Sequence, residues 1–253
     1  MATKVKAKRK TSAWVENVKT IIYAGLIAVA VRTVAFEPFN IPSGSMVPTL
    51  LVGDYLFVSK YSYGFSRYSL PFGWPPFSGR IFGAMPKQGD VAVFKWPGDN
   101  STDYIKRIIG LPGDHIQVRQ GQLYINGKLC PRRPEGPYTE IDRGIPIVKQ
   151  LYQETLPDNV KHDILKATDE GDANNTIEFV VPDNTVFAMG DNRDNSSDSR
   201  FPLERGGVGF VPLENLVGRA EVIFFSVDAE YPWWQFWWWP WEIRWNRLAM
   251  GVR

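Results

Sequence analysis

The sequence predicts a mainly β protein, in which an N-terminal transmembrane helix precedes an antiparallel β domain. Two observations support this prediction. Residues 21–31 form an apolar run behind a basic tail. After residue 50, short segments of strand-like character alternate with turn signals such as Asn126-Gly127, and no repeat or helical heptad is visible beyond residue 36. At 253 residues, the chain can hold one large domain or one domain with a sizeable insertion.

Composition excludes several classes of function. The formal net charge is +2 with 22% charged residues, so nothing indicates nucleic-acid binding. The single cysteine, Cys130, excludes an internal disulfide and a multi-cysteine zinc site, and we interpret it as a packed or incidental thiol. Only His115 and His162 are present, which excludes a histidine-rich metal centre. We therefore expect no metal and no cofactor.

The N-terminus predicts a membrane anchor behind a basic tail at residues 1–17. The apolar segment reaches about 20 residues, the length of a span, when it runs over residues 18–36 with Arg32 snorkelling to the interface. Lysines before it and few positive charges after it predict a cytoplasmic N-terminus and an exported remainder. A cleavable signal peptide ending near Ala28-Val29-Ala30 and a buried core helix are alternatives. Apolar residues beyond this site and the basic flank favour the uncleaved anchor.

Apolar and β-branched segments bounded by turn residues predict the strands of the β domain. They lie at residues 55–60, 91–96, 103–109, 123–125, 177–181, 185–189, 209–211 and 220–226.

Three segments lack this pattern. Residues 61–86 place aromatic side chains among Gly, Pro and Ser, and either fold over the core or dip into the lipid interface. Residues 131–176 are polar with weak periodicity, which indicates a loop-rich surface insertion. Residues 233–245 hold seven of the ten tryptophans and form either a contact with the lipid headgroup layer or an aromatic flap on the β domain.

Ser45 is a candidate nucleophile close to the membrane anchor. It lies in Pro42-Ser43-Gly44-Ser45-Met46-Val47-Pro48, where the prolines disfavour helix and Gly44 permits a tight turn. Ser45 follows Phe36 by only nine positions (45 − 36 = 9), a reach of at most about 30 Å. A serine hydroxyl presented on such a bend can attack a carbonyl once a base removes its proton.

Lys106 is the candidate base for this serine. On a strand it shares one face with Tyr104 and Ile108, and bulky neighbours reduce the hydration of an ammonium group. Loss of hydration lowers the pKa of a lysine and increases the neutral, basic form. A Ser-His-Asp triad is poorly supported, because His115 follows a turn and His162 lies in the polar insertion.

Three motifs follow one another behind the N-terminal segment. They are Pro-Ser-Gly-Ser-Met-x-Pro-Thr at 42–49, Tyr-Ile-Lys-Arg at 104–107 with Gly-Leu-Pro-Gly-Asp at 110–114, and Gly-Asp-Asn-Arg-Asp-Asn-Ser-x-Asp-Ser-Arg at 190–200. In this order they resemble the bacterial type I signal peptidases, the leader peptidases of the Ser-Lys class. The resemblance covers most of residues 15–226, and the third motif alone is highly specific.

The resemblance implies roles for individual residues. Ser45 would be the nucleophile and Lys106 the general base, while the Ser45 backbone N–H and the Ser43 hydroxyl would form the oxyanion hole. Ser196 would orient the lysine amine, and Asp198 and Arg200 would pair to support that wall. The matching positions of the pocket for small side chains are Phe39, Ile41, Met46, Leu50, Tyr104 and Ile105.

The resemblance also implies a domain organisation. Residues 37–114 and 188–230 would form an antiparallel β catalytic core of the signal peptidase type, with a second β-rich domain inserted at 115–187. The Trp-rich segment at 231–253 is not part of the family motifs. The chain also has one convincing span, whereas the best-known Gram-negative pattern has two.

The expected function is that of a membrane-bound serine endopeptidase. It would remove N-terminal signal peptides from exported preproteins after an Ala-x-Ala type site, without cofactor or metal. Its expected partners are preprotein signal peptides, membrane lipid and the protein export machinery. The expected location is the bacterial inner (plasma) membrane, with a single pass and the catalytic domain on the extracytoplasmic side. A specialised relative serving one exported client, such as a pilin or a conjugation factor, and an inactive membrane-anchored adaptor are the alternatives.

Overall fold

A computed structural model describes residues 13–70, 77–142, 145–228 and 239–252. Phe72, Trp74 and the tryptophans at 233–238 therefore lie outside the described residues. The helices are α1 (Ala13–Val34) and the short α2 (Trp239–Glu242). The strands are β1 (Phe36–Asn40), β2 (Asp54–Ser59), β3 (Val91–Lys95), β4 (Asp103–Gly110), β5 (His115–Arg119), β6 (Gln122–Ile125), β7 (Lys128–Leu129), β8 (Arg132–Asp142), β9 (Ile145–Thr155), β10 (Lys161–Lys166), β11 (Phe179–Val180), β12 (Thr185–Met189), β13 (Val211–Pro212), β14 (Leu216–Ser226) and β15 (Met250–Gly251).

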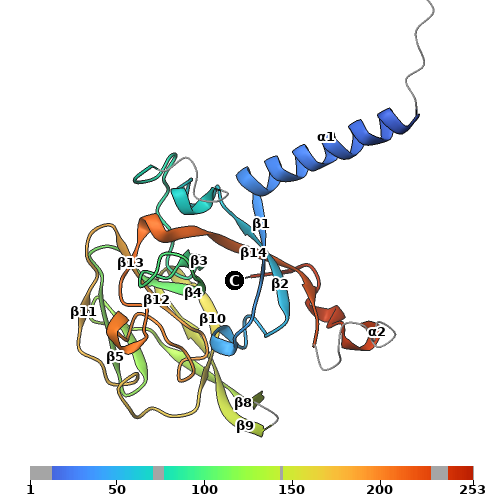
Figure 1. Ribbon diagram of the computed structural model, residues 1–253. Coiled ribbons are helices and arrows are strands. Elements are labelled where there is room, and N and C mark those ends of the chain that lie inside the picture. The colour runs from blue at the N-terminus through green and yellow to red at the C-terminus, as the bar shows by residue number, and fades with distance from the viewer. Residues whose placement is uncertain (1–12, 71–76, 143–144, 229–238, 253) are drawn as a thin grey trace, which may run out of the picture.

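An antiparallel sheet forms the centre of the molecule (Figure 1). Its strand order is β1-β2-β14-β3-β4-β12-β13, and β15 adds to β14. The pairings between these strands are antiparallel, so the prediction of a mainly antiparallel β fold is confirmed. The strands predicted at 55–60, 91–96 and 103–109 correspond to β2, β3 and β4.

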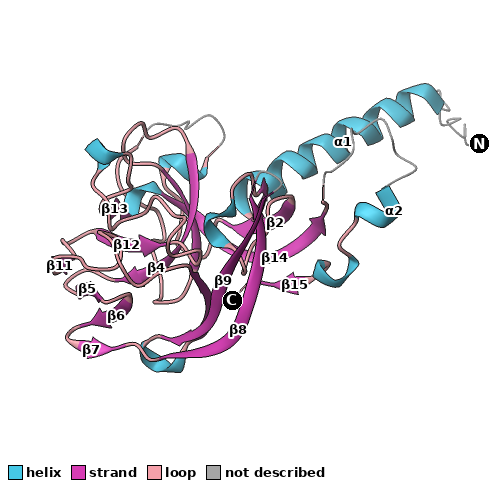
Figure 2. Cartoon of the chain, turned by 90° about the horizontal axis from the view of Figure 1, so that it is seen from below, coloured by secondary structure: helices cyan, strands magenta, loops and turns pink. Residues whose placement is uncertain are grey.

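The N-terminal helix projects away from the strands (Figures 1 and 2). It begins at Ala13 and ends at Val34, whereas the sequence predicted a segment over residues 18–36. Phe36 already belongs to β1, where it pairs with Ser59. This pairing with the sheet ends the helix before Phe36. Large apolar side chains on the helix are exposed, namely Ile21, Ile22, Leu26, Ile27 and Val29.

The described part of the chain contains no helix that is long and apolar enough to cross a membrane.

The prediction of a loop-rich segment at residues 131–176 is wrong for residues 132–166, whose described part is mostly strand, whereas residues 167–176 contain no helix or strand. Strands β8 and β9, each of 11 residues, form a long hairpin (Figure 2). Strand β10 pairs with β9, so the order of this sheet is β10-β9-β8. Pro134, Gly136 and Pro137 lie within β8 and conceal its pattern in the sequence. They are tolerated because β8 is an edge strand, where a missing N–H breaks no ladder on the open side.

A second small sheet contains the hairpin that the sequence predicted. Its order is β11-β5-β6-β7, and Ile125 pairs with Lys128 across the two-residue turn Asn126-Gly127. Asn126 and Gly127 both have positive φ, at 52° and 73°, as a type I′ turn requires.

Buried ion pairs hold the segment that follows β12. Arg193 donates from Nη1 to Glu154 Oε1 on β9 at 2.9 Å and from Nη2 to Oε2, and both side chains are almost completely buried. Burial opposes ionisation of Glu154, but the charge of Arg193 outweighs it and holds the pKa of the carboxyl below its usual value. This pair joins the β8–β9–β10 sheet to residues 190–200.

Replacing Glu154 should therefore destabilise the fold strongly. Glu154→Gln leaves the Arg193 charge buried without its counter-charge, and we expect the free energy of unfolding to fall by about 3 kcal/mol in a denaturant titration. The control is Glu135→Gln, because Glu135 pairs with the exposed Arg133 and should cost less than about 1 kcal/mol. Equal losses in the two variants would contradict the structural role of the buried pair.

Candidate active site

Ser45 lies in a short 3₁₀ turn, Gly44–Met46, directly after β1. The Met46 side chain holds the turn in place, because it is fully buried in the apolar cluster that includes Leu56 and Val58 of β2. Gly44 does not have a positive φ. A Cβ at this position would lie 3.1 Å from Glu140 Oε1. A side chain at this position would therefore crowd Glu140.

Lys106 meets Ser45 from the neighbouring strand β4. Its Nζ lies 2.7 Å from Ser45 Oγ and 3.1 Å from the carbonyl oxygen of Ile105. The lysine is only 4% exposed, and its amine lies 5.5 Å from the centre of the Tyr104 ring. The structure thus brings together the two residues that the sequence singled out.

Burial makes Lys106 a stronger candidate for a neutral amine. Loss of hydration lowers its pKa to about 8, the charges of Asp198 and Asp191 oppose this shift, and Arg200 adds to it. At pH 7 about one amine in ten is then neutral, compared with about one in a few thousand for an ordinary lysine. A neutral amine at hydrogen-bond distance can accept the hydroxyl proton of Ser45.

The segment 190–200 approaches the nucleophile through a glycine. A Cβ on Gly190 would lie 2.5 Å from the carbonyl oxygen of Ser45 and 2.3 Å from Ser196 Oγ, so only glycine fits. Asn192 stabilises this contact, because its backbone N donates to the carbonyl oxygen of Ser45 at 3.1 Å. Close packing of two backbones places the third motif against the first.

A buried pair of charges lies beside the dyad. Arg107 donates to both carboxylate oxygens of Asp191, at 2.8 and 2.7 Å, and Thr49 Oγ1 donates to Oδ2 at 2.5 Å. Burial disfavours the carboxylate, yet Arg107 keeps the pKa of Asp191 below its ordinary value. Sequence analysis gave Arg107 and Asp191 no role, although both lie in the quoted motifs.

Asp198 and Arg200 form a second bidentate pair. Arg200 Nε and Nη2 donate to Asp198 Oδ1 and Oδ2 at 2.9 and 2.8 Å. Asp198 Oδ2 also accepts from Gly190 N at 3.0 Å, so the pair supports the glycine that contacts Ser45. Ser196 is buried nearby, but its Oγ has no hydrogen-bond partner among the described residues and does not bond to Lys106. Its orienting role stays a prediction.

The predicted pocket residues lie mostly in one cluster. Ile41, Met46 and Leu50 are buried together, and the half-buried Phe39 and Ile105 pack against them. Tyr104 belongs to the neighbouring cluster and stacks on Trp96, with 6.1 Å between the ring centres. Ser43, the predicted second oxyanion donor, is exposed in an extended conformation, and its hydroxyl does not cap the turn.

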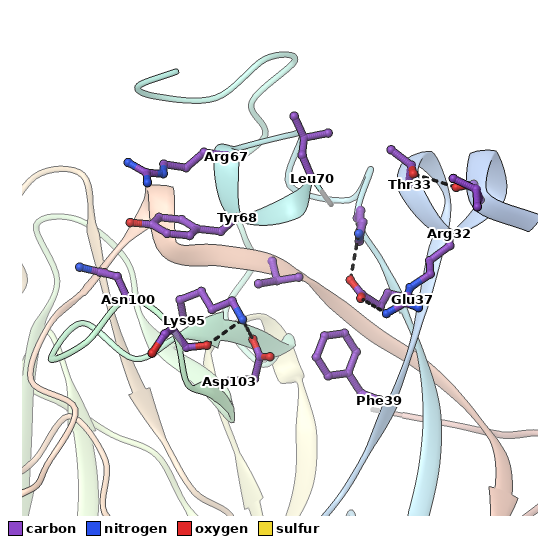
Figure 3. Close-up of a pocket in the computed structure, with 14 residues that line it drawn as sticks. Arg32, Thr33, Glu37, Phe39, Arg67, Tyr68, Leu70, Lys95, Asn100 and Asp103 are labelled. Carbon is purple, nitrogen blue, oxygen red and sulfur yellow. Dashed lines mark hydrogen bonds and ion pairs between the residues drawn. The ribbon is translucent and has the colours of Figure 1, made fainter. Parts of the chain in front are cut away.

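A hollow of about 750 Å³ lies between the end of α1, β1 and the start of β4 (Figure 3). Phe39, Tyr68 and Leu70 supply apolar walls. Ion pairs lie at its rim: Lys95 Nζ is 2.9 Å from Asp103 Oδ1, and Glu37 contacts Arg32 and Lys60 at 3.1 and 2.9 Å. Phe39 belongs both to this hollow and to the predicted pocket, so the two spaces adjoin.

The two histidines lie elsewhere. His162 is fully buried, with Nε2 at 3.4 Å from Glu154 Oε2 and from Arg193 Nη2, and burial together with the charge of Arg107 lowers its pKa. His115 is half-exposed beside Glu178. Cys130 is buried, which raises the pKa of its thiol to about 12.

The polar contacts made by the β8–β9 hairpin were not predicted from the sequence. Glu140 and Lys149 pair with each other and reach Asn192, whose side chain contacts the backbone beside Ser45. Asn192 could have been suspected from the third motif, which contains it. Glu140 and Lys149 carried no such signal, because they lie in the segment that was expected to form loops.

A serine hydroxyl against a buried lysine of lowered pKa is an arrangement suited to a serine hydrolase with a lysine base. Comparison with known proteins agrees. The profile of the family described as signal peptidase, peptidase S26, matches residues 14–225. Signal peptidase I of Rickettsia typhi is 44% identical over 216 residues, covering 82% of this chain and 78% of the relative. Signal peptidase I of Rickettsia canadensis is 42% identical over 224 residues, covering 85% and 81%.

The chain therefore belongs to the signal peptidase family, peptidase S26. It is a serine protease of the type that removes signal peptides. Among solved structures, a signal peptidase I from Enterococcus faecalis is 27% identical, covers 54% of this chain and 97% of its own, and has a TM-score of 0.30.

The lowered pKa of Lys106 predicts the pH dependence of the reaction. Only the neutral amine accepts a proton, so kcat/KM should fall as the pH falls through the pKa of about 8 and reach a plateau above it. We expect this midpoint when the cleavage rate of a precursor is measured between pH 6 and 10. A midpoint near 6.5 would indicate a histidine, and one near 10.4 a hydrated lysine.

Proposed function

We propose that this chain removes N-terminal signal peptides from exported preproteins after an Ala-x-Ala type site, with Ser45 as nucleophile and Lys106 as general base. The observation that carries the proposal is the 2.7 Å contact between Lys106 Nζ and Ser45 Oγ in a buried site. It favours an active enzyme over the inactive adaptor. The range of precursors that the protein cleaves distinguishes an enzyme for many preproteins from one that serves a single dedicated client.

The chemistry follows from this contact. Lys106 takes the proton of Ser45 as Oγ attacks the scissile carbonyl carbon, and the carbonyl oxygen becomes an oxyanion. In the proposed mechanism the Ser45 N–H and the Ser43 hydroxyl stabilise this charge. Lys106 then protonates the departing amine, which leaves an acyl-enzyme on Ser45. Water, deprotonated by the same lysine, hydrolyses the acyl-enzyme and restores the site.

Free strand edges provide a place for the signal peptide. Among the described strands, β1 pairs only with β2, and residues 103–106 of β4 pair only with β3. An extended peptide along these edges would satisfy its own backbone groups. Alternate side chains of an extended peptide point to the same face, so the two alanines of Ala-x-Ala would both face the cluster that contains Ile41 and Met46.

A two-part organisation of the β region is part of the proposal. The central sheet is built largely from residues 37–114 and 188–230, the proposed catalytic core, together with β12 at Thr185–Met189. Residues 115–187, proposed as the inserted β-rich domain, supply all strands of the two smaller sheets.

Although the described helix does not by itself reach the length and apolarity of a membrane span, we propose that the N-terminal segment is a single-pass anchor in the plasma membrane, with a cytoplasmic N-terminus and the catalytic domain outside. The exposed apolar side chains of α1 and its projection from the sheet support this proposal (Figure 1). The exposed Trp241 and Trp245 support contact of the C-terminal segment with lipid headgroups. The protein export machinery is a further proposed partner.

Loss of either member of the dyad should abolish cleavage. For the detergent-solubilised protein and a precursor with an Ala-x-Ala site, we expect Ser45→Ala and Lys106→Met to lower kcat by at least about 10³-fold, because each removes the nucleophile or its base. The exposed Lys128→Met on β7 is the control and should cleave normally. Cleavage that survives Lys106→Met, in protein with an unchanged Tm, would refute the mechanism.

Charges placed on the helix should weaken membrane anchoring. Two lysines in Leu26→Lys/Ile27→Lys each disfavour a position in hydrocarbon by about 2.5–3.5 kcal/mol. We expect the unmodified chain to stay in the pellet after alkaline extraction of membranes and this variant to be partly released. Val148→Lys, on the exposed hairpin, should stay in the pellet. Complete extraction of the unmodified protein would contradict the anchor.

A further inference from the structure

The peptide unit between Gly44 and Ser45 is held from one side by Asn192. Asn192 Nδ2 donates to the carbonyl oxygen of Gly44 at 2.9 Å, and its backbone N donates to the carbonyl oxygen of Ser45 at 3.1 Å. Gly44 O also accepts from Val47 N at 3.2 Å. Asn192 therefore donates hydrogen bonds to the carbonyl groups of both peptide units that flank the nucleophile.

The hydrogen bond to the Gly44 carbonyl determines the direction of the Ser45 N–H. In a trans peptide the C=O and the following N–H lie in one plane and point in opposite directions. Fixing the Gly44 carbonyl toward Asn192 therefore directs the Ser45 N–H away from Asn192. A hydrogen bond to the carbonyl oxygen of Gly44 polarises the whole peptide unit. The Ser45 N–H, which belongs to the same peptide unit, therefore becomes a better donor. The proposed function assigns this N–H to the oxyanion.

The orientation of the Asn192 amide is itself fixed. Lys149 Nζ lies 2.9 Å from Asn192 Oδ1, and an ammonium group has only donors. The amide oxygen must therefore face Lys149, which leaves Nδ2 facing Gly44. Glu140 strengthens this choice, since it pairs with Lys149 and places both carboxylate oxygens 3.2 and 3.3 Å from Nδ2.

These contacts are buried and tight. Asn192 is fully buried and Lys149 is 7% exposed, so water does not readily replace their hydrogen bonds. Glu140 lies so close to residue 44 that a Cβ there would be 3.1 Å from its Oε1. The base of this arrangement is the β8–β9 hairpin, in which Glu140 and Lys149 come from opposite strands.

We propose that Asn192 is a positioning residue for the oxyanion donor and that Glu140 and Lys149 hold its amide in the working orientation. The inference rests on the proposed function, because it assigns the Ser45 N–H to the oxyanion. It gives the β8–β9 hairpin a part in catalysis without contact with the reacting atoms. The expected signature is a loss of transition-state stabilisation with little change in substrate binding.

The first test uses Asn192→Asp, which keeps the shape and the acceptor for Lys149 but cannot donate to Gly44 O. We expect kcat for a precursor peptide to fall about 10- to 100-fold with KM nearly unchanged. The matched control is Asn195→Asp in the same motif, since Asn195 is exposed. The control should keep the kcat and KM of the unmodified protein.

A peptide aldehyde supplies the specific readout. Ser45 Oγ adds to the aldehyde carbon, its proton passes to Lys106, and the aldehyde oxygen becomes an anion in the oxyanion hole. Affinity for the aldehyde should fall about 10- to 100-fold in Asn192→Asp, while affinity for the matching peptide carboxamide, which forms no adduct, stays unchanged. Equal falls for both ligands would mean general distortion and would overturn the proposal, as would no fall for either.

If Asn192→Asp folds poorly, Lys149→Met tests whether Lys149 holds the Asn192 amide in its working orientation. The variant removes the donor to Asn192 Oδ1 and leaves Asn192 and the Ser45 turn intact. We expect a smaller selective loss of aldehyde affinity, about 3- to 10-fold, with unchanged carboxamide affinity. Unchanged aldehyde affinity in this variant would overturn the role of the hairpin. Absence of cleavage and adduct formation in the unmodified protein would instead refute the proposed function.

Discussion

The burial of Lys106 against Ser45 is the interaction on which the rest of the site depends. Lowering the pKa of a lysine from its ordinary value to about 8 disfavours the charged form by roughly 3 kcal/mol. The fold sustains this cost by placing Lys106 on β4 beside β3, with Tyr104 and Ile108 on the same face of the strand. In the proposed mechanism, the neutral amine then lets the Ser45 hydroxyl act as a nucleophile without a histidine.

Two buried carboxylates near the lysine would by themselves raise its pKa and weaken this effect. Asp191 and Asp198 both act in that direction. Each is paired in bidentate fashion with an arginine, Arg107 and Arg200, so much of its charge is neutralised locally. The same pairs fix the backbone of residues 190–200 against the Ser45 turn. Electrostatic tuning and positioning are therefore carried out by the same side chains.

The sequence predicted much of this arrangement because its signals are local. Strand alternation put Lys106 on a crowded face, Asn126-Gly127 marked a hairpin, and the three motifs pointed to segments that the structure brings together. The orienting role expected for Ser196 has no supporting hydrogen bond in the described part of the site and remains a prediction.

Other features depend on tertiary contacts and left no local trace. Proline and glycine within the edge strand β8 concealed the hairpin, and with it the contacts of Glu140 and Lys149 to Asn192. The sequence predicted a tight turn at Gly44, which lies in the 3₁₀ turn Gly44–Met46. The proximity of Glu140, a residue almost a hundred positions away in the chain, was not predicted, although a Cβ on residue 44 would lie 3.1 Å from its Oε1.

The most direct test of this account is the pKa of the Lys106 amine itself. NMR titration of the protein with ¹⁵N-labelled lysine side chains, compared with Lys106→Arg to assign the resonance, would follow its protonation without reference to catalysis. The account predicts a midpoint near 8. A midpoint near the ordinary lysine value of about 10.4 would show that the amine is charged at working pH, and would contradict its role as the base.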